Sequence, residues 1–235
     1  MLSSVVIESI PEINYPIPLK QITLIGGLFD VLRPSVIEAI AQEVQKTKPN
    51  VNVVQPGARQ KKLWFLEQYE LIEDTGFVEL IFLPFLKLAD KSILGVTCQN
   101  NAIHIHRSNH SYEELHSARH VLQRLAMMVF SLVNERVLLV EQIENGLHYS
   151  AYEDLWINLL ESATFLEAQV IATTHSLEMI EVFAKNAEEF NQDDDHRAYY
   201  LEIATKFKTG EPIPIKRDPD VLLYALEHDK KVRGD

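Results

Sequence analysis

The sequence contains one cysteine, no excess of positive charge and no apolar run of about 18 residues, the length needed to span a bilayer. With Cys98 alone, no disulfide can form within the chain, which favours a reducing compartment, and we expect the cytoplasm. The N-terminal region also lacks a basic segment followed by a long apolar one, so no export signal is expected. These absences predict a protein without membrane association.

Basic residues are outnumbered, with 22 Lys and Arg against 34 Asp and Glu, which gives a net charge of −12. Such a charge repels a phosphate backbone and argues against non-specific nucleic-acid binding. A local basic patch at Arg59, Lys61 and Lys62 leaves a contact with DNA or RNA open, although a solvated loop is the favoured interpretation. No GxSxG sequence is present either, so Ser-His-Asp catalysis has no support.

The apolar content of 46% over 235 residues is enough for a substantial core. We expect one domain over residues 1–235, with residues 49–110 as its variable region. Two continuous apolar runs, 137–140 and 170–172, flank a helical segment around Trp156, which we expect in the core. This pattern is typical of parallel strands covered on both faces, and the polar residues after such strands lie where open α/β sheets bind ligands.

Periodicity and turn residues predict the remaining elements. We expect further strands at 4–13, 20–25, 92–97, 102–106 and 198–205, and helices at 34–46, 63–71, 112–133, 177–190 and 220–229. Residues 15–18, 49–57 and 212–219 are interpreted as turns or loops, and 76–86 as an apolar strand or a short helix.

Five of the nine histidines are crowded into one region: His104, His106, His110, His116 and His120. Two share a strand face and two lie one helical turn apart, so a zinc or nickel site is sterically conceivable. Without a cysteine or a defined carboxylate partner, surface or interface residues are the favoured interpretation. The run of aspartates at 193–195 is likewise interpreted as a solvated loop rather than a cation site.

Two longer stretches resemble a known family. ENGLHYSAYEDLW at 144–156 and VIATTHSLEMI at 170–180, with the ending LxxALEHxxxVR at 222–233, are similar to the ABC-type ATPase domains of the AAA family, such as those of RecF, SMC and OLD proteins. The resemblance implies an α/β, P-loop NTPase-like fold, a mostly parallel sheet flanked by helices with a reduced helical lobe. It also implies ATP and Mg²⁺ as cofactors, and a homodimer or a heteromer with a related ATPase.

The phosphate loop expected from the resemblance is altered. A working loop has the pattern GxxxxGK[ST], and the aligned window here runs from Gly27 to Pro34. Leu32 replaces the second glycine, Arg33 the lysine and Pro34 the hydroxyl residue, which removes a backbone donor and a metal-binding oxygen. The resemblance gives these candidate nucleotide-binding positions: Gly26, Gly27, Arg33, Ser35 and, in the signature loop, Ser117.

The catalytic positions implied by the resemblance are Glu141, Gln142 and His175. The family has Asp-Glu after the second catalytic strand, where this chain has Glu141-Gln142; Glu141 is a weak metal candidate, and Gln142 cannot act as a general base. His175, in an intact Thr-Thr-His-Ser, occupies the position that senses the γ-phosphate.

Two functional hypotheses follow from these departures. The first is a catalytically degenerate ATPase-like protein that acts through dimerisation or partner binding. The second is an ATP-hydrolysing enzyme that uses Arg33, Glu141 and His175 in a non-standard site. A structural alternative applies to both, in which the polar residues at the strand ends are satisfied by hydrogen bonds within the protein.

Overall fold

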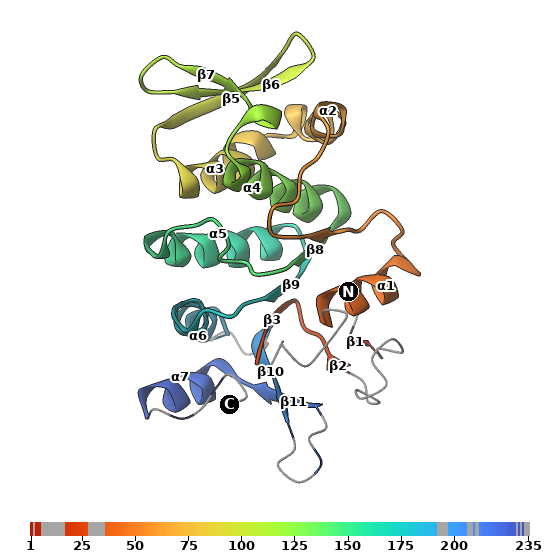
Figure 1. Ribbon diagram of the computed structural model, residues 1–235, viewed down its shortest axis with the longest axis vertical. Helices are drawn as coiled ribbons and strands as arrows, with labels where there is room; N and C mark the ends of the chain where they lie inside the picture. The colour runs from red at the N-terminus through yellow and green to blue at the C-terminus, as the bar shows by residue number, and fades with distance from the viewer. Residues whose placement is uncertain are drawn as a thin grey trace.

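We describe the protein from a computed structural model of residues 1–235. The residues described are 1, 3–5, 17–27, 36–191, 197–205, 209, 212–228, 230 and 232. Figure 1 shows a small sheet at one end of the molecule, a stack of helices next to it, and α7(Pro219–Glu227) at the other end.

A six-stranded sheet of order β11-β10-β3-β9-β8-β4 forms the centre of the described part of the chain. Its strands are β3(Ile22–Gly27), β4(Val53–Val54), β8(Val137–Val140), β9(Gln169–Thr173), β10(Ala198–Thr205) and β11(Pro212–Arg217). All neighbouring pairs are parallel except β10 and β11. The expected mostly parallel sheet is therefore confirmed.

Helices cover both faces of this sheet. On one face, α1(Val36–Gln45) packs its buried residues against outward-facing apolar side chains of β3, β8, β9 and β10. On the other face lie α4(His120–Phe130), α5(Tyr152–Phe165), α6(Leu177–Phe190) and α7. Trp156 is fully buried there, as expected. Because both faces are covered, β8 and β9 are buried along their whole length, which explains their continuous apolar sequences.

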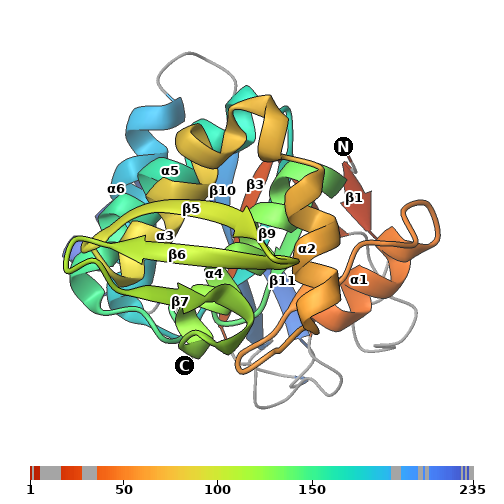
Figure 2. The same cartoon turned by 90° about the horizontal axis from the view of Figure 1, so that it is seen from above.

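A smaller lobe is built from residues between β4 and α4. It contains α2(Lys62–Glu70), the turn η2(Glu73–Thr75), the π-helical segment η3(Val78–Phe82) and α3(Leu83–Ala89). An antiparallel sheet of β5(Ile93–Gln99), β6(Ala102–Arg107) and β7(Tyr112–Glu114) completes it, and Figure 2 shows this sheet from above, beside α2. The reduced lobe that the resemblance implies is thus partly a β-structure.

Several sequence expectations are confirmed within a residue or two. The strands at 137–140 and 198–205 and the helix at 177–190 match β8, β10 and α6, and the hairpin around 99–101 matches β5 and β6. The segment 76–86, left open between strand and helix, is helical. The helices expected at 34–46, 63–71 and 220–229 correspond to α1, α2 and α7.

Other expectations are wrong. The helix expected over 112–133 begins only at His120, because Tyr112–Glu114 pairs with β6 as β7 and Leu115–Ser117 forms a 3-10 turn, η4. After Phe130 the helix continues as the π-helical segment η5(Ser131–Glu135).

Two regions interpreted as loops contain strands. Residues 49–57 include β4, which is only two residues long and pairs with β8. Residues 212–217 form β11 despite two prolines, which a sheet tolerates because β11 lies at the edge. Near the N-terminus, β1(Ser4–Val5) pairs with β2(Ile17–Pro18). The two residues of β2 belong to the segment 15–18, which was expected to form a turn. Residues 6–16 and the aspartates at 193–195 lie outside the described residues.

None of the described helices is both long and apolar enough to cross a bilayer.

Candidate functional site

Five parallel strands of the central sheet end at the same edge. The chain leaves β3 through α1 on one face and leaves β9 through α6 on the other. Since β3 and β9 are neighbours, their carboxyl ends are the kind of position at which open α/β sheets bind ligands. The residues after β8 and β9 therefore form the candidate site.

The turn after β8, from Glu141 to Asn145, is fixed by the buried side chain of Arg124 from α4. Its Nη2 donates to the carbonyls of Glu141 at 2.6 Å and Gln142 at 2.9 Å. Its Nη1 donates to the carbonyls of Ile143 at 3.2 Å and Asn145 at 3.1 Å. One guanidinium thus binds four backbone acceptors of the turn, and among the described residues only Gln142 O has a second donor, the N–H of Asn145 at 2.8 Å.

Arg124 is 4% exposed, and burial lowers its pKa to about 10, against the opposing attraction of Glu144 and Glu141. The guanidinium therefore remains charged at neutral pH. Sequence reasoning missed this residue. The available signal was a charged residue in the otherwise apolar helix HVLQRLAMMVF, which requires a buried partner or an exit to solvent.

Gln142 occupies the position where the resemblance requires a catalytic carboxylate. Its backbone is left-handed, with φ of 48°, and its N–H donates to Thr173 Oγ1 at 3.0 Å. The side chain is a carboxamide, which cannot take up a proton from water at neutral pH. The turn therefore keeps its shape while lacking the general base.

Glu141 is half-buried beside Gln142. Burial raises the pKa of its carboxyl, and Glu38 on α1 raises it further, while His175 and Arg124 lower it. These interactions place Glu141 close to His175, as the resemblance implies, and also close to Glu38, which sequence reasoning did not single out.

Glu144 joins the turn after β8 to the end of β9. Its Oε1 accepts a hydrogen bond from the backbone N–H of His175 at 3.2 Å. Its Oε2 is buried and has no hydrogen-bond partner among the described residues. The His175 side chain itself is exposed. The neighbouring threonines bond within the protein: Thr174 donates its N–H to Ile25 O at 3.0 Å and accepts from Ser176 N–H at 3.1 Å.

Gly26 and Gly27 have packing reasons to be glycine. A Cβ at Gly26 would lie 2.0 Å from Tyr200 Oη, and one at Gly27 would lie 2.2 Å from the Ile203 carbonyl oxygen. Gly27 also has a backbone φ of 115°, a value that residues with a side chain rarely adopt. The fit of β3 against β10 thus accounts for both glycines, and a role in binding nucleotide stays a prediction. Arg33 and Ser35 lie outside the described residues, together with Leu32 and Pro34.

Gln55 is a further polar residue at this edge that the sequence analysis did not identify. Val54 pairs with Val140, so Gln55 follows β4 just as Glu141 follows β8. Its Nε2 donates to Glu38 Oε1 at 2.8 Å. The signal was available only once the two-residue strand β4 was known.

Ser117 lies on the lobe side, in the 3-10 turn before α4. It is exposed, and its Oγ is 3.1 Å from His116 Nε2. The first turn of α4 packs against the loop after β8, since a Cβ at Gly146 would lie 3.3 Å from Val121 Cβ. The position of the expected signature loop and the Asn-Gly-Leu-His loop are therefore neighbours on the surface.

The histidines of the middle region do not converge. His106 Nε2 lies 2.6 Å from Thr97 Oγ1, His116 Nδ1 lies 3.1 Å from Glu114 Oε2, and His120 bonds to Arg59. Among the described residues, no group of three or more His, Cys, Asp or Glu side chains is arranged to hold a metal ion.

The described residues match Mg²⁺ and ATP only in part. Glu141 is the carboxylate that directly follows β8, and the next position is an amide rather than a second carboxylate. The space next to the glycines at the end of β3 is occupied by side-chain and backbone atoms of β10. No step of ATP hydrolysis is therefore assigned to these residues.

Comparisons with known proteins agree with the sequence resemblance. The profile of the family described as "AAA domain, putative AbiEii toxin, Type IV TA system" matches residues 119–181. This segment contains Arg124, the turn after β8 and the Thr-Thr-His-Ser sequence. No curated protein is similar enough in sequence to count as a relative.

Similar solved structures include an SMC ATPase, 13% identical, with a TM-score of 0.41, covering 71% of this chain and 99% of that one. CbiO1 from Clostridium perfringens, part of an ABC transporter complex, is 12% identical, with a TM-score of 0.48, and covers 92% of this chain and 85% of its own. The SMC head domain of Thermotoga maritima is 13% identical, with a TM-score of 0.37 and coverage of 71% and 53%. All three TM-scores are below 0.5, which is too low to support an argument about function. The family profile and the observed sheet together confirm the resemblance to the ABC/AAA-type ATPase domains, with the direct sequence match confined to residues 119–181.

Proposed function

We propose that this chain is an ATPase-like protein that does not hydrolyse ATP and acts by binding a second copy of itself or a related ATPase. One observation carries the proposal: Gln142 stands in a turn held rigidly by Arg124, at the position that requires a carboxylate. The frame of a catalytic turn is thus kept where its general base is replaced. Preservation of shape without the reactive group favours a binding role over turnover.

The chain would act as one domain, because α4 packs against both the lobe helix α3 and β4, the edge strand of the six-stranded sheet. The free thiol of Cys98 supports a cytoplasmic location, where such thiols stay reduced.

The surface proposed for partner binding consists of residues 145–150 and 175–178, here called the strand-end surface. Most of these residues are exposed, and the side chains of Tyr149 and Leu177 are 70% and 38% exposed. His148 stacks at a tilt on Tyr149, with ring centroids 4.3 Å apart. An exposed aromatic pair and an exposed leucine are suited to burial against a protein, since such side chains contribute most where interfaces exclude water.

The absence of turnover can be tested with purified protein and Mg·ATP. We expect no phosphate release above the blank, and no rise in melting temperature with ATP. Release that is lost in His175→Ala but retained in His228→Ala, a matched change at an exposed histidine of α7, would contradict the proposal.

Partner binding can be tested by measuring molar mass in solution across a range of protein concentrations. We expect a dimer, or a stable complex with a related ATPase supplied separately, and weakening by Tyr149→Ala. A chain that remains monomeric and binds no ATPase partner at tens of micromolar would remove the support for this role.

A second candidate is an ATP-hydrolysing enzyme with a non-standard site, favoured by the raised pKa of Glu141 beside His175. A carboxyl whose pKa moves toward neutrality is better suited to exchange a proton. This candidate requires phosphate release that falls in Glu141→Gln and persists in Glu135→Gln, a control in η5.

A further inference from the structure

A large cavity lies away from the carboxyl ends of β3 and β9. It has a volume of about 860 Å³ and is enclosed by α1, the segment from Pro49 to Gln60, α2, and the end of α4 with η5. Only Glu38 and Gln55 are shared with the edge described above. The volume falls within the range of about 300–1,000 Å³ that is typical of small-molecule sites.

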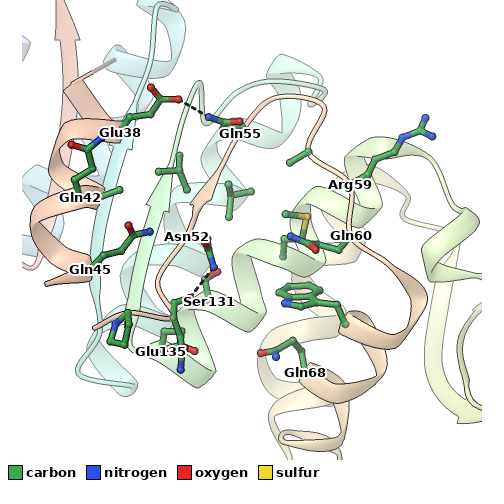
Figure 3. A pocket seen from close by; sticks show the side chains of 18 residues that line it. Glu38, Gln42, Gln45, Asn52, Gln55, Arg59, Gln60, Gln68, Ser131 and Glu135 are labelled. Atoms are coloured by element: carbon green, nitrogen blue, oxygen red, sulfur yellow. Dashed lines mark hydrogen bonds between the residues drawn. The ribbon is translucent and has the colours of Figure 1, made fainter. Parts of the chain in front are cut away.

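Carboxamides dominate the lining, as Figure 3 shows for most of them. The lining residues with a carboxamide side chain are Gln42, Gln45, Asn50, Asn52, Gln55, Gln60 and Gln68. A carboxamide carries both a donor and an acceptor, so the direction of its existing bonds determines what it offers to a ligand.

Three amide donors of this lining are used within the protein. Gln45 Nε2 donates to Val51 O at 2.7 Å, Asn52 Nδ2 to Asn50 O at 2.9 Å, and Gln55 Nε2 to Glu38 Oε1 at 2.8 Å. Gln68 is oriented the other way, because its Oε1 accepts from Asn134 Nδ2 at 2.9 Å. At Gln45, Asn52 and Gln55 the lining therefore presents acceptor oxygens, which favours a ligand with donors.

The charges in the cavity favour a cation. Glu38 and Glu135 lie at opposite ends of it in Figure 3. The one cation in the lining, Arg59, points away and bonds to His120, with Nε 2.9 Å from Nε2. Lys48 donates to the backbone carbonyl of Glu135 at 2.8 Å from outside the lining. Anionic ligands such as phosphates meet repulsion here.

The wall between the two ends is partly apolar. Trp64 and Met127 line the cavity, and Trp64 is held by edge-on contacts with Phe65 and Phe130 at 5.3 and 5.9 Å between centroids. A rigid indole beside a thioether offers contact to methylene groups and to an ammonium near the ring.

We propose that this cavity binds a linear aliphatic polyamine. One terminal ammonium is accepted by Glu38 and the oxygens of Gln45 and Gln55, the methylene chain lies against Trp64 and Met127, and the other ammonium faces Glu135. This inference is independent of the proposed function, because neither ATP nor the strand-end surface enters it.

The test is a calorimetric titration of the whole protein with spermidine at physiological ionic strength. Because a chain of net charge −12 attracts any polyamine weakly, two variants with the same charge change are compared. Gln42→Lys places a cation at the cavity, and Gln99→Lys places one at the exposed turn between β5 and β6. We expect Gln42→Lys to weaken binding by about tenfold or more, and Gln99→Lys to change it by less than about twofold.

Two further ligands separate the contributions. Triethylene glycol is similar in length to spermidine but lacks charge, and 1-aminobutane is shorter and has a single ammonium; we expect both to bind at least about tenfold more weakly than spermidine. Equal weakening of spermidine by the two lysine variants would show that only overall charge attracts it and would overturn the proposal. Binding of triethylene glycol as tight as that of spermidine, or no heat of binding with spermidine at millimolar concentration, would also overturn it.

Discussion

The turn after β8 and the carboxamide-lined cavity both concentrate polar groups, but they use them in opposite ways. In the turn, the Arg124 guanidinium donates hydrogen bonds to four backbone carbonyls within the protein. In the cavity, the donors are used locally, and the acceptor oxygens of Gln45 and Gln55 face a large open space. The first region is held together by its polar contacts, whereas the second lines a cavity with them.

This contrast separates preserved architecture from preserved chemistry. At the strand ends, the backbone N–H groups of Gln142 and His175 and the Thr174 hydroxyl form hydrogen bonds within the protein. That the side chains of Glu141, Gln142 and His175 are satisfied in the same way stays a prediction. The Oε2 atom of Glu144 is buried without a partner in the described part of the chain.

The largest expected effect is on the turn. Arg124→Met removes the guanidinium donors from four carbonyls of the turn, of which, within the described part of the chain, only Gln142 O keeps a backbone donor, the N–H of Asn145. We expect a loss of about 3–5 kcal/mol in the free energy of unfolding, measured by urea titration. Arg119→Ala, at a side chain that is 60% exposed one residue before the same helix, should stay within about 0.5 kcal/mol. A similar small loss for Arg124→Met would show that the turn does not depend on this side chain.

The glycine at the end of β3 offers the next test. In Gly26→Ala the new Cβ meets Tyr200 Oη at 2.0 Å, and Tyr200 is itself fixed by a 2.7 Å bond to Val232 O. We expect destabilisation near the upper end of about 1–3 kcal/mol. Gly95→Ala is the matched control, since nothing lies within 4 Å of its Cβ position. Unchanged stability of Gly26→Ala would return the explanation of this glycine to ligand binding.

A third change tests the exposed side of the turn. Tyr149→Ala removes a side chain that is 70% exposed, so stability should change by less than about 0.5 kcal/mol. Binding to the partner should weaken by about 1–2 kcal/mol, measured by sedimentation or calorimetry. Tyr224→Ala, 52% exposed on α7, is the control and should leave association unchanged.

The smallest effect concerns pH. Burial, and then Glu38, raise the pKa of Glu141 above its ordinary value of 4.5, so the folded state holds a proton that the unfolded state has released. The cost grows as pH rises through the folded pKa and vanishes below the unfolded value. Glu141→Gln should thus stabilise the protein at pH 7 by about 0.5 kcal/mol or less, because solvent screens a half-exposed group, and should have no effect near pH 4.

Asp90 supplies a control of opposite sign. Burial acts to raise its pKa, but hydrogen bonds from Ser92 and Arg107 lower it overall. Its ionised form stabilises the fold above the unfolded pKa, and this contribution is lost as pH falls. Asp90→Asn should therefore destabilise at pH 7 and converge with the parent protein in acid. If both variants moved stability in the same direction at pH 7, the electrostatic interpretation of the turn would be wrong.

The sequence predicted those parts of the fold whose cause is local. Strands β8 and β10 and helix α6 carry strong periodic or continuous apolar patterns, so their bounds were recognisable. Strand β4 was missed because two valines give no period, and β11 because Pro212 and Pro214 normally indicate a turn. Both strands exist because a neighbour completes their hydrogen bonds, and pairing across the sheet is not written in a local pattern.

The candidate site was predicted in the same uneven way. Glu141, Gln142 and His175 come together at one edge, because they follow strands that were recognised. Arg124 and Gln55 were not predicted, since their contacts join segments whose proximity depends on the sheet order. Ser117 was predicted in the signature loop, although the helix predicted from residue 112 would have contained it. The structure begins that helix at His120, after Ser117.

The position of β3 in the sheet has a consequence for synthesis. Ile22 pairs with Val170 on one side and with Ala198 on the other, so β3 is synthesised well before both of its partner strands. At cellular rates of translation, these partners emerge on the order of ten seconds later. An apolar segment with unpaired backbone on both sides is exposed to aggregation during that interval. Newly made chains should therefore need chaperone protection until β10 is available, and truncation before Ala198 should yield insoluble protein.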